Sequence, residues 1–213
     1  MPLVHFHRHA IDGKDVEAER DRAIALVRLA IDHPVLDFGR SLSGMALPEL
    51  EAASSRDDSD LPAWEAKGNA LWFLGRLEEA ALAFEKVLHA APDREQSLSG
   101  MANLSLRLRR VDSARVHAER LLGVSPWRWR HHLLLGQVNG QARDWGLALK
   151  AGGRALELNP SEPTVRQFLV LCHLRLGERA QAQKEFDTMM AMNPPRPEVL
   201  RRWFADVSRQ AGR

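Results

Sequence analysis

Proline recurs in this chain at a fixed interval of 34 residues, four times in succession. Alanine and two columns of apolar residues recur at the same interval. The columns are Pro92, Pro126, Pro160 and Pro194; Ala80, Ala114, Ala148 and Ala182; Val87, Leu121, Ala155 and Met189; and Leu88, Leu122, Leu156 and Met190. A fixed period of this length indicates a structural unit stacked on copies of itself, because each unit buries its apolar face only against its neighbours. The period therefore predicts a solenoid.

Each interval between prolines has the composition of two helices. Alanine, leucine, arginine and glutamate dominate, which favours α-helix, and proline ends the second helix because it lacks the N–H of the next helical hydrogen bond. Small residues at Gly68, Ala102 and Gly136 let the first helix approach the alanine column of the second. Asp60 and Asp93 stand where helices should begin, and we expect both to act as N-caps, the latter within a capping box.

The period is clearest over Ala63–Pro92, AWEAKGNALWFLGRLEEAALAFEKVLHAAP. This stretch resembles the tetratricopeptide repeat (TPR) family at Trp64, Gly68, Ala80, Phe84 and Pro92. The resemblance implies an all-α fold, a TPR right-handed superhelical solenoid of antiparallel helix pairs, in which each repeat has a helix A and a helix B. It covers four repeats, at residues 61–94, 95–128, 129–162 and 163–196.

Some positions depart from the family pattern. Ser105, Asn139 and His173 replace a family aromatic at one core position. Gly152 stands at a phenylalanine position and Val170 at a glycine position. We therefore expect poorer packing in the third repeat.

The two ends should cover the solenoid. Residues 197–213 are predicted to form a C-terminal capping helix, because apolar side chains form one stripe on it. The stripe is Val199, Leu200, Trp203, Phe204 and Val207. Residues 14–60 are interpreted as a degenerate N-terminal helical pair, with helices at Asp15–Asp32 and Ser43–Ser55. Residues 1–13 are expected to form an N-terminal tail.

Motifs of catalysis are absent from the sequence. It has no glycine-rich phosphate loop, nucleophile elbow or HExxH motif, so we expect no enzymatic activity, no catalytic residue and no cofactor. Cys172 is the single cysteine, which excludes an intrachain disulfide, and we expect it to fill the core. His5, His7 and His9 could ligate a metal on an extended segment. A solvated tail without metal is the preferred interpretation of these histidines.

The chain more weakly resembles the C-terminal TPR part of bacterial multihaem-cytochrome/TPR proteins. The CxxCH motif of haem attachment is absent, so the resemblance bears only on origin or partner. No apolar run is long enough to span a membrane or act as a secretory signal. We therefore expect a cytoplasmic location for the chain as written, and a periplasmic one if it derives from a longer exported precursor.

The TPR resemblance implies a partner-binding groove along the A helices. The family's ligand positions are here Asn69, Trp72, Phe73, Asn103, Arg107, Trp127, Arg128, Arg130 and Gln137. The amides would form a ladder along the backbone of an extended peptide, and an exposed aromatic would anchor it. Arginines outnumber carboxylates at groove positions: Arg94, Arg107, Arg128, Arg130, Arg175 and Arg196 against Glu65, Asp93 and Glu162. The groove should therefore prefer an acidic partner.

These observations predict a non-catalytic protein–protein interaction scaffold that binds an extended, acidic peptide segment. One alternative is an accessory module of a periplasmic multihaem redox protein. The other is a nucleic-acid binder, because Arg107–His132 is rich in arginine with Trp127 and Trp129 interleaved. The formal net charge of only +2 argues against nucleic acid as partner.

Overall fold

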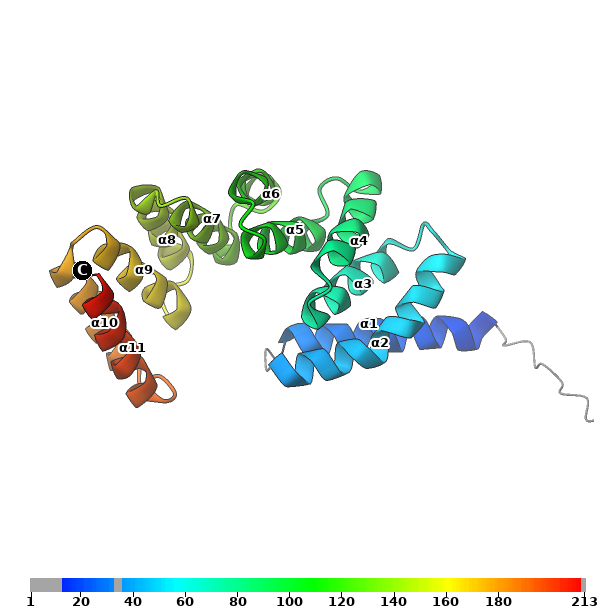
Figure 1. The fold of residues 1–213 in the computed structure, drawn as a ribbon, viewed down its shortest axis with the longest axis horizontal. Coiled ribbons are helices and arrows are strands. Elements are labelled where there is room, and N and C mark those ends of the chain that lie inside the picture. Colours follow the sequence, from blue (N-terminus) through cyan, green and yellow to red (C-terminus); the bar gives the residue numbers. More distant parts are fainter. Residues whose placement is uncertain (1–12, 33–35, 212–213) are drawn as a thin grey trace, which may run out of the picture. The chain divides into compact units, whose positions relative to one another are not determined.

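The alanine- and leucine-rich sequence between the prolines forms helices that are joined by short turns. The computed structural model describes residues 13–32 and 36–211, which form eleven α-helices and no strand (Figure 1). The helices are α1 Gly13–Asp32, α2 Leu36–Arg56, α3 Leu61–Leu74, α4 Leu77–Ala90, α5 Glu95–Arg107, α6 Val111–Val124, α7 Trp129–Gln141, α8 Trp145–Leu158, α9 Pro163–Arg175, α10 Arg179–Ala191 and α11 Pro197–Gln210. The predicted tail falls almost wholly outside the described residues.

Eight of these helices form the four pairs that the 34-residue period predicts. The pairs α3 and α4, α5 and α6, α7 and α8, and α9 and α10 each pack as neighbours. Each helix B ends just before the proline of its repeat, at Ala90, Val124, Leu158 and Ala191. The prediction of an all-α solenoid of antiparallel helix pairs is therefore confirmed.

The helices fall into two compact units, Met1–Pro92 and Asp93–Arg213, called unit 1 and unit 2 here. Unit 1 holds α1–α4, and α1 packs on both α2 and α3. Unit 2 holds α5–α11, and its successive A helices α5, α7 and α9 contact one another. Of the predicted groove residues, Asn69, Trp72 and Phe73 therefore belong to unit 1 and the others to unit 2.

Glycines in the helix pairs make room for aromatic rings. A Cβ atom at Gly68 would lie 2.8 Å from Cε1 of Phe84, closer than carbon atoms pack. In the third repeat the ring comes from the next helix A. A Cβ atom at Gly136 would lie 2.8 Å from Phe168, and one at Gly152 would lie 3.0 Å from the same ring. Phe168 of α9 thus occupies the space that a phenylalanine at position 152 would fill, which compensates for the departure from the family pattern.

The polar residues that replace the family aromatics find polar partners. Ser105 is buried, and its hydroxyl lies 3.1 Å from that of Ser113. Buried Asn139 accepts a hydrogen bond of 2.6 Å from Arg115 of α6. His173 Nδ1 lies 2.7 Å from a carboxylate oxygen of Glu178. Hydrogen bonding of this kind avoids the cost of an unsatisfied buried polar group, so these substitutions leave the helix pairs intact.

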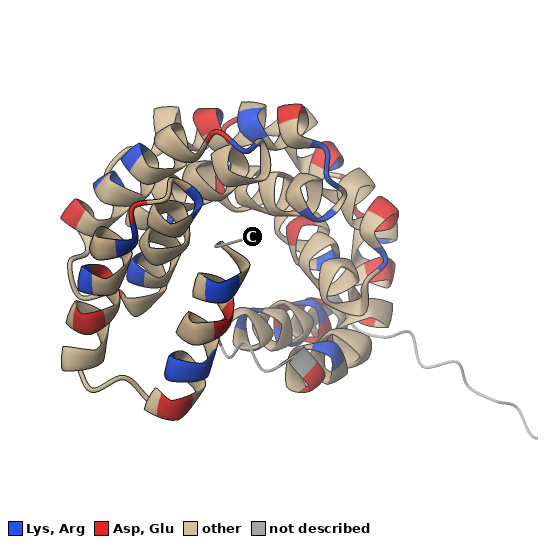
Figure 2. Cartoon of the chain, turned by 60° about the vertical axis from the view of Figure 1, so that its left-hand side comes forward, with Lys and Arg blue, Asp and Glu red and all other residues tan. Residues whose placement is uncertain are grey.

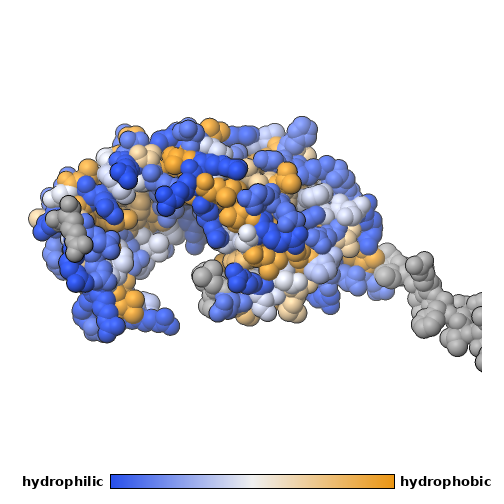
Figure 3. All heavy atoms as spheres, in the orientation of Figure 1, coloured by the Kyte–Doolittle hydropathy of each residue, from blue (hydrophilic) through white to orange (hydrophobic). Residues whose placement is uncertain are grey.

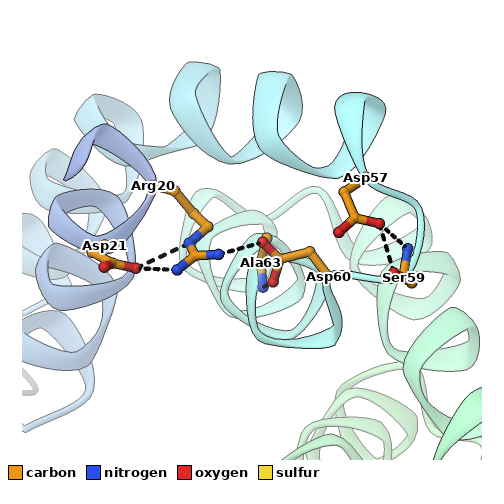
Figure 4. A network of polar contacts seen from close by, with 6 residues as sticks. All are labelled: Arg20, Asp21, Asp57, Ser59, Asp60 and Ala63. Atoms are coloured by element: carbon orange, nitrogen blue, oxygen red, sulfur yellow. Dashed lines mark hydrogen bonds and ion pairs between the residues drawn. The ribbon is translucent and has the colours of Figure 1, made fainter. Parts of the chain in front are cut away.

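Asp60 caps α3, as predicted. Its Oδ1 accepts the backbone N–H of Ala63 at 3.0 Å, and its Oδ2 accepts a hydrogen bond of 3.2 Å from Arg20 of α1 (Figure 4). Close by, Asp57 accepts the N–H and the hydroxyl of Ser59. An N-cap stabilises a helix by about 1 kcal/mol. Here the same carboxylate also joins α1 to α3.

The predicted N-cap role of Asp93 is wrong. The N-cap of α5 is Arg94, and no side chain caps this helix. Asp93 instead accepts a hydrogen bond of 3.2 Å from Arg120 of α6. The extended backbone of Arg94 starts the helix one residue later than expected, which removes the spacing that a capping box requires.

The last helix packs on the fourth repeat through its apolar stripe. Leu200, Trp203, Phe204 and Val207 of α11 lie against a core that includes Phe186 and Met189 of α10. The rings of Phe186 and Phe204 stack with a centroid distance of 4.2 Å and an interplanar angle of 13°. This packing agrees with a capping role for α11. We expect removal of α11 to destabilise the protein, and this remains a prediction.

Candidate functional site

One face of the A helices in unit 2 carries arginines and amides and no carboxylate. It consists of the second, fifth, ninth, twelfth and thirteenth positions of each repeat, which share one side of a helix. We call it the A-helix face: Gln96, Ser99, Asn103, Leu106 and Arg107 on α5; Arg130, Gln137 and Gln141 on α7; Thr164, Gln167, Leu171 and Arg175 on α9. The residues at the remaining positions, Leu133, Gly140 and Leu174, are buried. Because successive A helices contact each other, the face runs from α5 through α7 to α9. Figure 2 marks the lysines and arginines of the described chain in blue and the aspartates and glutamates in red.

Two amides of this face, Asn103 and Gln141, are held by hydrogen bonds to backbone carbonyls. Half-buried Asn103 donates from Nδ2 to the carbonyl of Ser99 at 2.8 Å. Exposed Gln141 donates from Nε2 to the carbonyl of Leu106 at 3.0 Å, which links α7 to α5. Gln137 is exposed between them. Fixing the nitrogen of an amide orients its carbonyl oxygen, which can then accept an N–H of another chain.

Two arginines of the face lie over tryptophan rings. Arg130 lies 4.8 Å from the ring centroid of Trp129, and Arg175 lies 5.7 Å from that of Trp145. Cation–π contacts of this length hold a guanidinium without neutralising its charge. Neither arginine forms an ion pair with a residue that the structure describes, and both are exposed. They can therefore pair with carboxylates of another molecule.

Arg128 is different, because it already has a carboxylate partner. Its Nε lies 2.8 Å from Oε1 of Glu95, and the hydroxyl of Ser125 donates to Oε2 of the same side chain at 2.8 Å. Buried His131 lies 3.5 Å from Glu95 and 3.2 Å from the carbonyl of Ser125. This cluster fixes the turn between α6 and α7. It leaves Trp127 on the surface with 66% of its area exposed.

The buried imidazole of His131 should make stability depend on pH. Burial lowers the pKa of His131 from its ordinary value of 6.5, assisted by the charges of Arg128 and His132 and opposed by Glu95. The unfolded chain therefore takes up this proton at higher pH than the folded chain. The stability contribution is full above about pH 6.5 and is lost as the pH falls toward the folded-state pKa.

Urea unfolding at neutral pH and at about pH 5 measures how much stability the protein loses when His131 becomes protonated. Replacement by glutamine, which cannot be protonated, should make the loss of stability between the two conditions smaller than in the native protein. An equal loss in the native protein and in His131→Gln would contradict the assignment.

In unit 1 the predicted aromatic anchors are half-buried. Trp72 and Phe73 contact each other edge to face, with ring centroids 5.1 Å apart and an interplanar angle of 83°. Phe73 also lies against α2, where a Cβ atom at Gly39 would be 3.0 Å from its ring. Asn69 donates from Nδ2 to the carbonyl of Glu65 at 3.0 Å, as Asn103 does in the next repeat. Phe73 thus contributes to packing, and the exposed aromatic of the predicted set is Trp127.

The predicted set missed exposed arginines in the turns between helices A and B. Arg109 and Arg143 occupy the same repeat position, where the first and fourth repeats have Gly75 and Gly177. Aligning the sequence at 34-residue intervals shows arginine in place of glycine at this position, so the sequence alone could have identified these two arginines.

The remaining candidates for chemistry are Cys172 and clusters of metal-ligating side chains. Burial raises the pKa of the Cys172 thiol to about 12, which keeps it protonated at neutral pH. Within the described residues no three His, Cys, Asp or Glu side chains gather as a metal would require. His5, His7 and His9 lie outside that part of the chain. Among the described helices none has the length and apolar character to cross a membrane.

The repeated helix pairs and the polar A-helix face define a helical-repeat scaffold. The family model of the tetratricopeptide repeat matches residues 45–95 and 100–163, together more than half of the chain. The chain therefore belongs to the tetratricopeptide repeat family.

The chain is also similar to solved structures and to one curated protein. MamA from Desulfovibrio magneticus RS-1 has a TM-score of 0.72 at 21% identity, covering 84% of this chain and 94% of that one. MamA of AMB-1 has a TM-score of 0.66 at 18% identity, covering 85% and 93%. The CTR9 homolog of Arabidopsis thaliana is 26% identical over 149 residues, or 69% of this chain, and the chain spans about a tenth of that protein's length. At these identities the structural likeness shows the fold alone.

Proposed function

We propose that this chain is a non-catalytic scaffold that binds an extended, acidic segment of another protein on the A-helix face of unit 2. The observation that carries the proposal is the charge of this face. It presents Arg107, Arg130 and Arg175 and no aspartate or glutamate. The arginines attract the carboxylates of an acidic segment, and the face has no carboxylate of its own to repel them.

The amides support an extended conformation of the partner. The carbonyl oxygens of Asn103 and Gln137 lie on successive A helices and can accept backbone N–H groups, which an extended peptide leaves unpaired. Exposed Trp127 adds an apolar surface at the N-terminal end of α7, as aromatic anchors do in many interfaces. On the side of the molecule drawn in Figure 3, apolar residues emerge in small groups among polar ones. Because the A-helix face carries arginines and amides, recognition would rest mainly on charge and hydrogen bonds.

Fluorescence anisotropy with a labelled peptide tests the proposal. The probe is a short peptide in which glutamate occupies every third position between glycine and serine. Asn103→Ala should weaken binding by about 0.5–1.5 kcal/mol through the lost hydrogen bond. Arg130→Glu should weaken it more at low salt than at high salt, because ions screen exposed charges.

Arg154→Glu is the matched control. Arg154 is exposed on α8, away from the A-helix face, and pairs with Glu157. Its reversal changes the net charge as much as Arg130→Glu does. If both reversals weaken binding equally, attraction to the whole molecule would explain the result and the A-helix face would not be the site.

A further inference from the structure

The turn between helices A and B has one geometry in all four repeats. A hydrogen bond closes it from the residue that follows the left-handed position back to a carbonyl five residues earlier. The bonds run from Arg76 to Leu71, Arg110 to Ser105, Asp144 to Asn139 and Glu178 to His173, at 2.8–2.9 Å. The left-handed residues are Gly75 at φ 80°, Arg109 at 57°, Arg143 at 66° and Gly177 at 80°.

Glycine is the residue that this geometry favours, because a Cβ atom in the left-handed region crowds the following carbonyl. At Gly75 and Gly177 a Cβ atom would meet no other atom within 4 Å, so the cost there comes from the backbone alone. Arg109 and Arg143 carry that cost in the two middle turns. Strained positions of this kind are often retained where the side chain has a function.

These arginines belong to a strongly basic edge of unit 2. We define the A–B edge as residues 107–111, 141–145 and 175–179. It has six exposed arginines and two carboxylates: Arg107, Arg109, Arg110, Arg143, Arg175 and Arg179 against Asp144 and Glu178. Both carboxylates have partners inside unit 2, since Asp144 lies 3.5 Å from Arg115 and Glu178 lies 2.7 Å from His173. Arg109, Arg110, Arg143 and Arg179 form no ion pair with the described residues.

The opposite edge of the same helices is balanced. We define the B–A edge as residues 93–95, 124–129, 158–163 and 191–197, and it has three residues of each charge. They are Arg94, Arg128 and Arg196 against Asp93, Glu95 and Glu162. The basic character is therefore a property of one edge and not of turns in general.

We propose that the A–B edge of unit 2 is a second contact surface for an acidic protein segment, and that Arg109 and Arg143 select its charge pattern. This inference rests on the proposed function, because the edge adjoins the A-helix face through Arg107, Gln141 and Arg175. Neighbouring helices pack with axes about 8–10 Å apart. An extended chain advances about 3.3 Å per residue, so it passes from one repeat to the next in about three residues. The preferred partner therefore has a carboxylate at about every third position.

Replacing both left-handed arginines by glycine should raise the stability of the protein and weaken its binding of the acidic peptide. The double variant Arg109→Gly/Arg143→Gly relieves the backbone cost, so its melting temperature should rise, by about 2–4 °C for each position. Its affinity for the spaced glutamate peptide should fall about two- to five-fold for each arginine, as exposed ion pairs allow. Arg109→Lys/Arg143→Lys keeps both charges and should bind within about two-fold of the native protein.

A second peptide tests the spacing. It has the same composition as the spaced peptide, but its glutamates are consecutive. The native protein should prefer the spaced peptide, and the double glycine variant should lose this preference.

Each outcome decides between the two proposals. A higher melting temperature with unchanged affinity would overturn the role of the A–B edge, while loss of binding in Arg130→Glu would still support the A-helix face. Unchanged affinity in both Arg130→Glu and the double glycine variant would reject both the A-helix face and the A–B edge as binding surfaces. Tighter binding of a fluorescent oligothymidylate than of the peptide, lost in the double glycine variant, would assign the edge to single-stranded nucleic acid and overturn the proposal.

Discussion

Phe84→Ala should destabilise the protein by about 3–5 kcal/mol, the usual cost of removing a fully buried aromatic ring. Phe84 is completely buried in the first repeat, and its ring lies where Gly68 has no side chain. Helices α3 and α4 pack against each other through this ring. Gly68 has no side chain that could fill the space left in Phe84→Ala. Urea unfolding followed by circular dichroism measures the change in the free energy of unfolding.

Leu82→Ala is the control for this experiment. Leu82 lies on the same helix, two residues away, with 65% of its area exposed. It loses a large apolar side chain too, but one that was already in water, so the change should stay within about 0.5 kcal/mol. Comparable losses in the two variants would mean that the ring of Phe84 does not hold α3 against α4.

Deletion of residues 197–213 should cost about 2–4 kcal/mol and promote aggregation. The deletion exposes the apolar residues of α9 and α10 on which α11 packs, including Phe186 and Met189. The loss is the apolar burial of four half-buried side chains, offset in part by the ordering entropy of the helix. The melting temperature and light scattering of the shortened chain measure both effects.

Two point variants on α11 distinguish the loss of its packing contacts from misfolding of the shortened chain. Phe204→Ala removes the ring that stacks on Phe186, and it should reproduce part of the loss. Val199→Ala changes a residue of the same helix that is 59% exposed and should be nearly neutral. A deletion product as stable and soluble as the native chain would remove the capping role of α11.

The sequence by itself determined the number, order and type of the central helices. The proline and alanine columns repeat with one period, and each repeat needs only its neighbours to bury its apolar face. The positions of the A-helix face came from the TPR resemblance, and helical spacing puts those of one helix on the same side. That Arg130, Asn103 and Gln137 bind a partner together remains a prediction.

Tertiary structure alone decided which side chains meet across repeats. Phe168 of one repeat fills the space at Gly152 of another, and Arg128 pairs with Glu95, thirty-three positions earlier in the chain. Periodicity fixes where a residue stands in its own repeat, but distances between repeats depend on how side chains of different size pack together. The sequence shows arginine at two turns where the other repeats have glycine, and the structure adds that Arg109 and Arg143 have positive φ angles there.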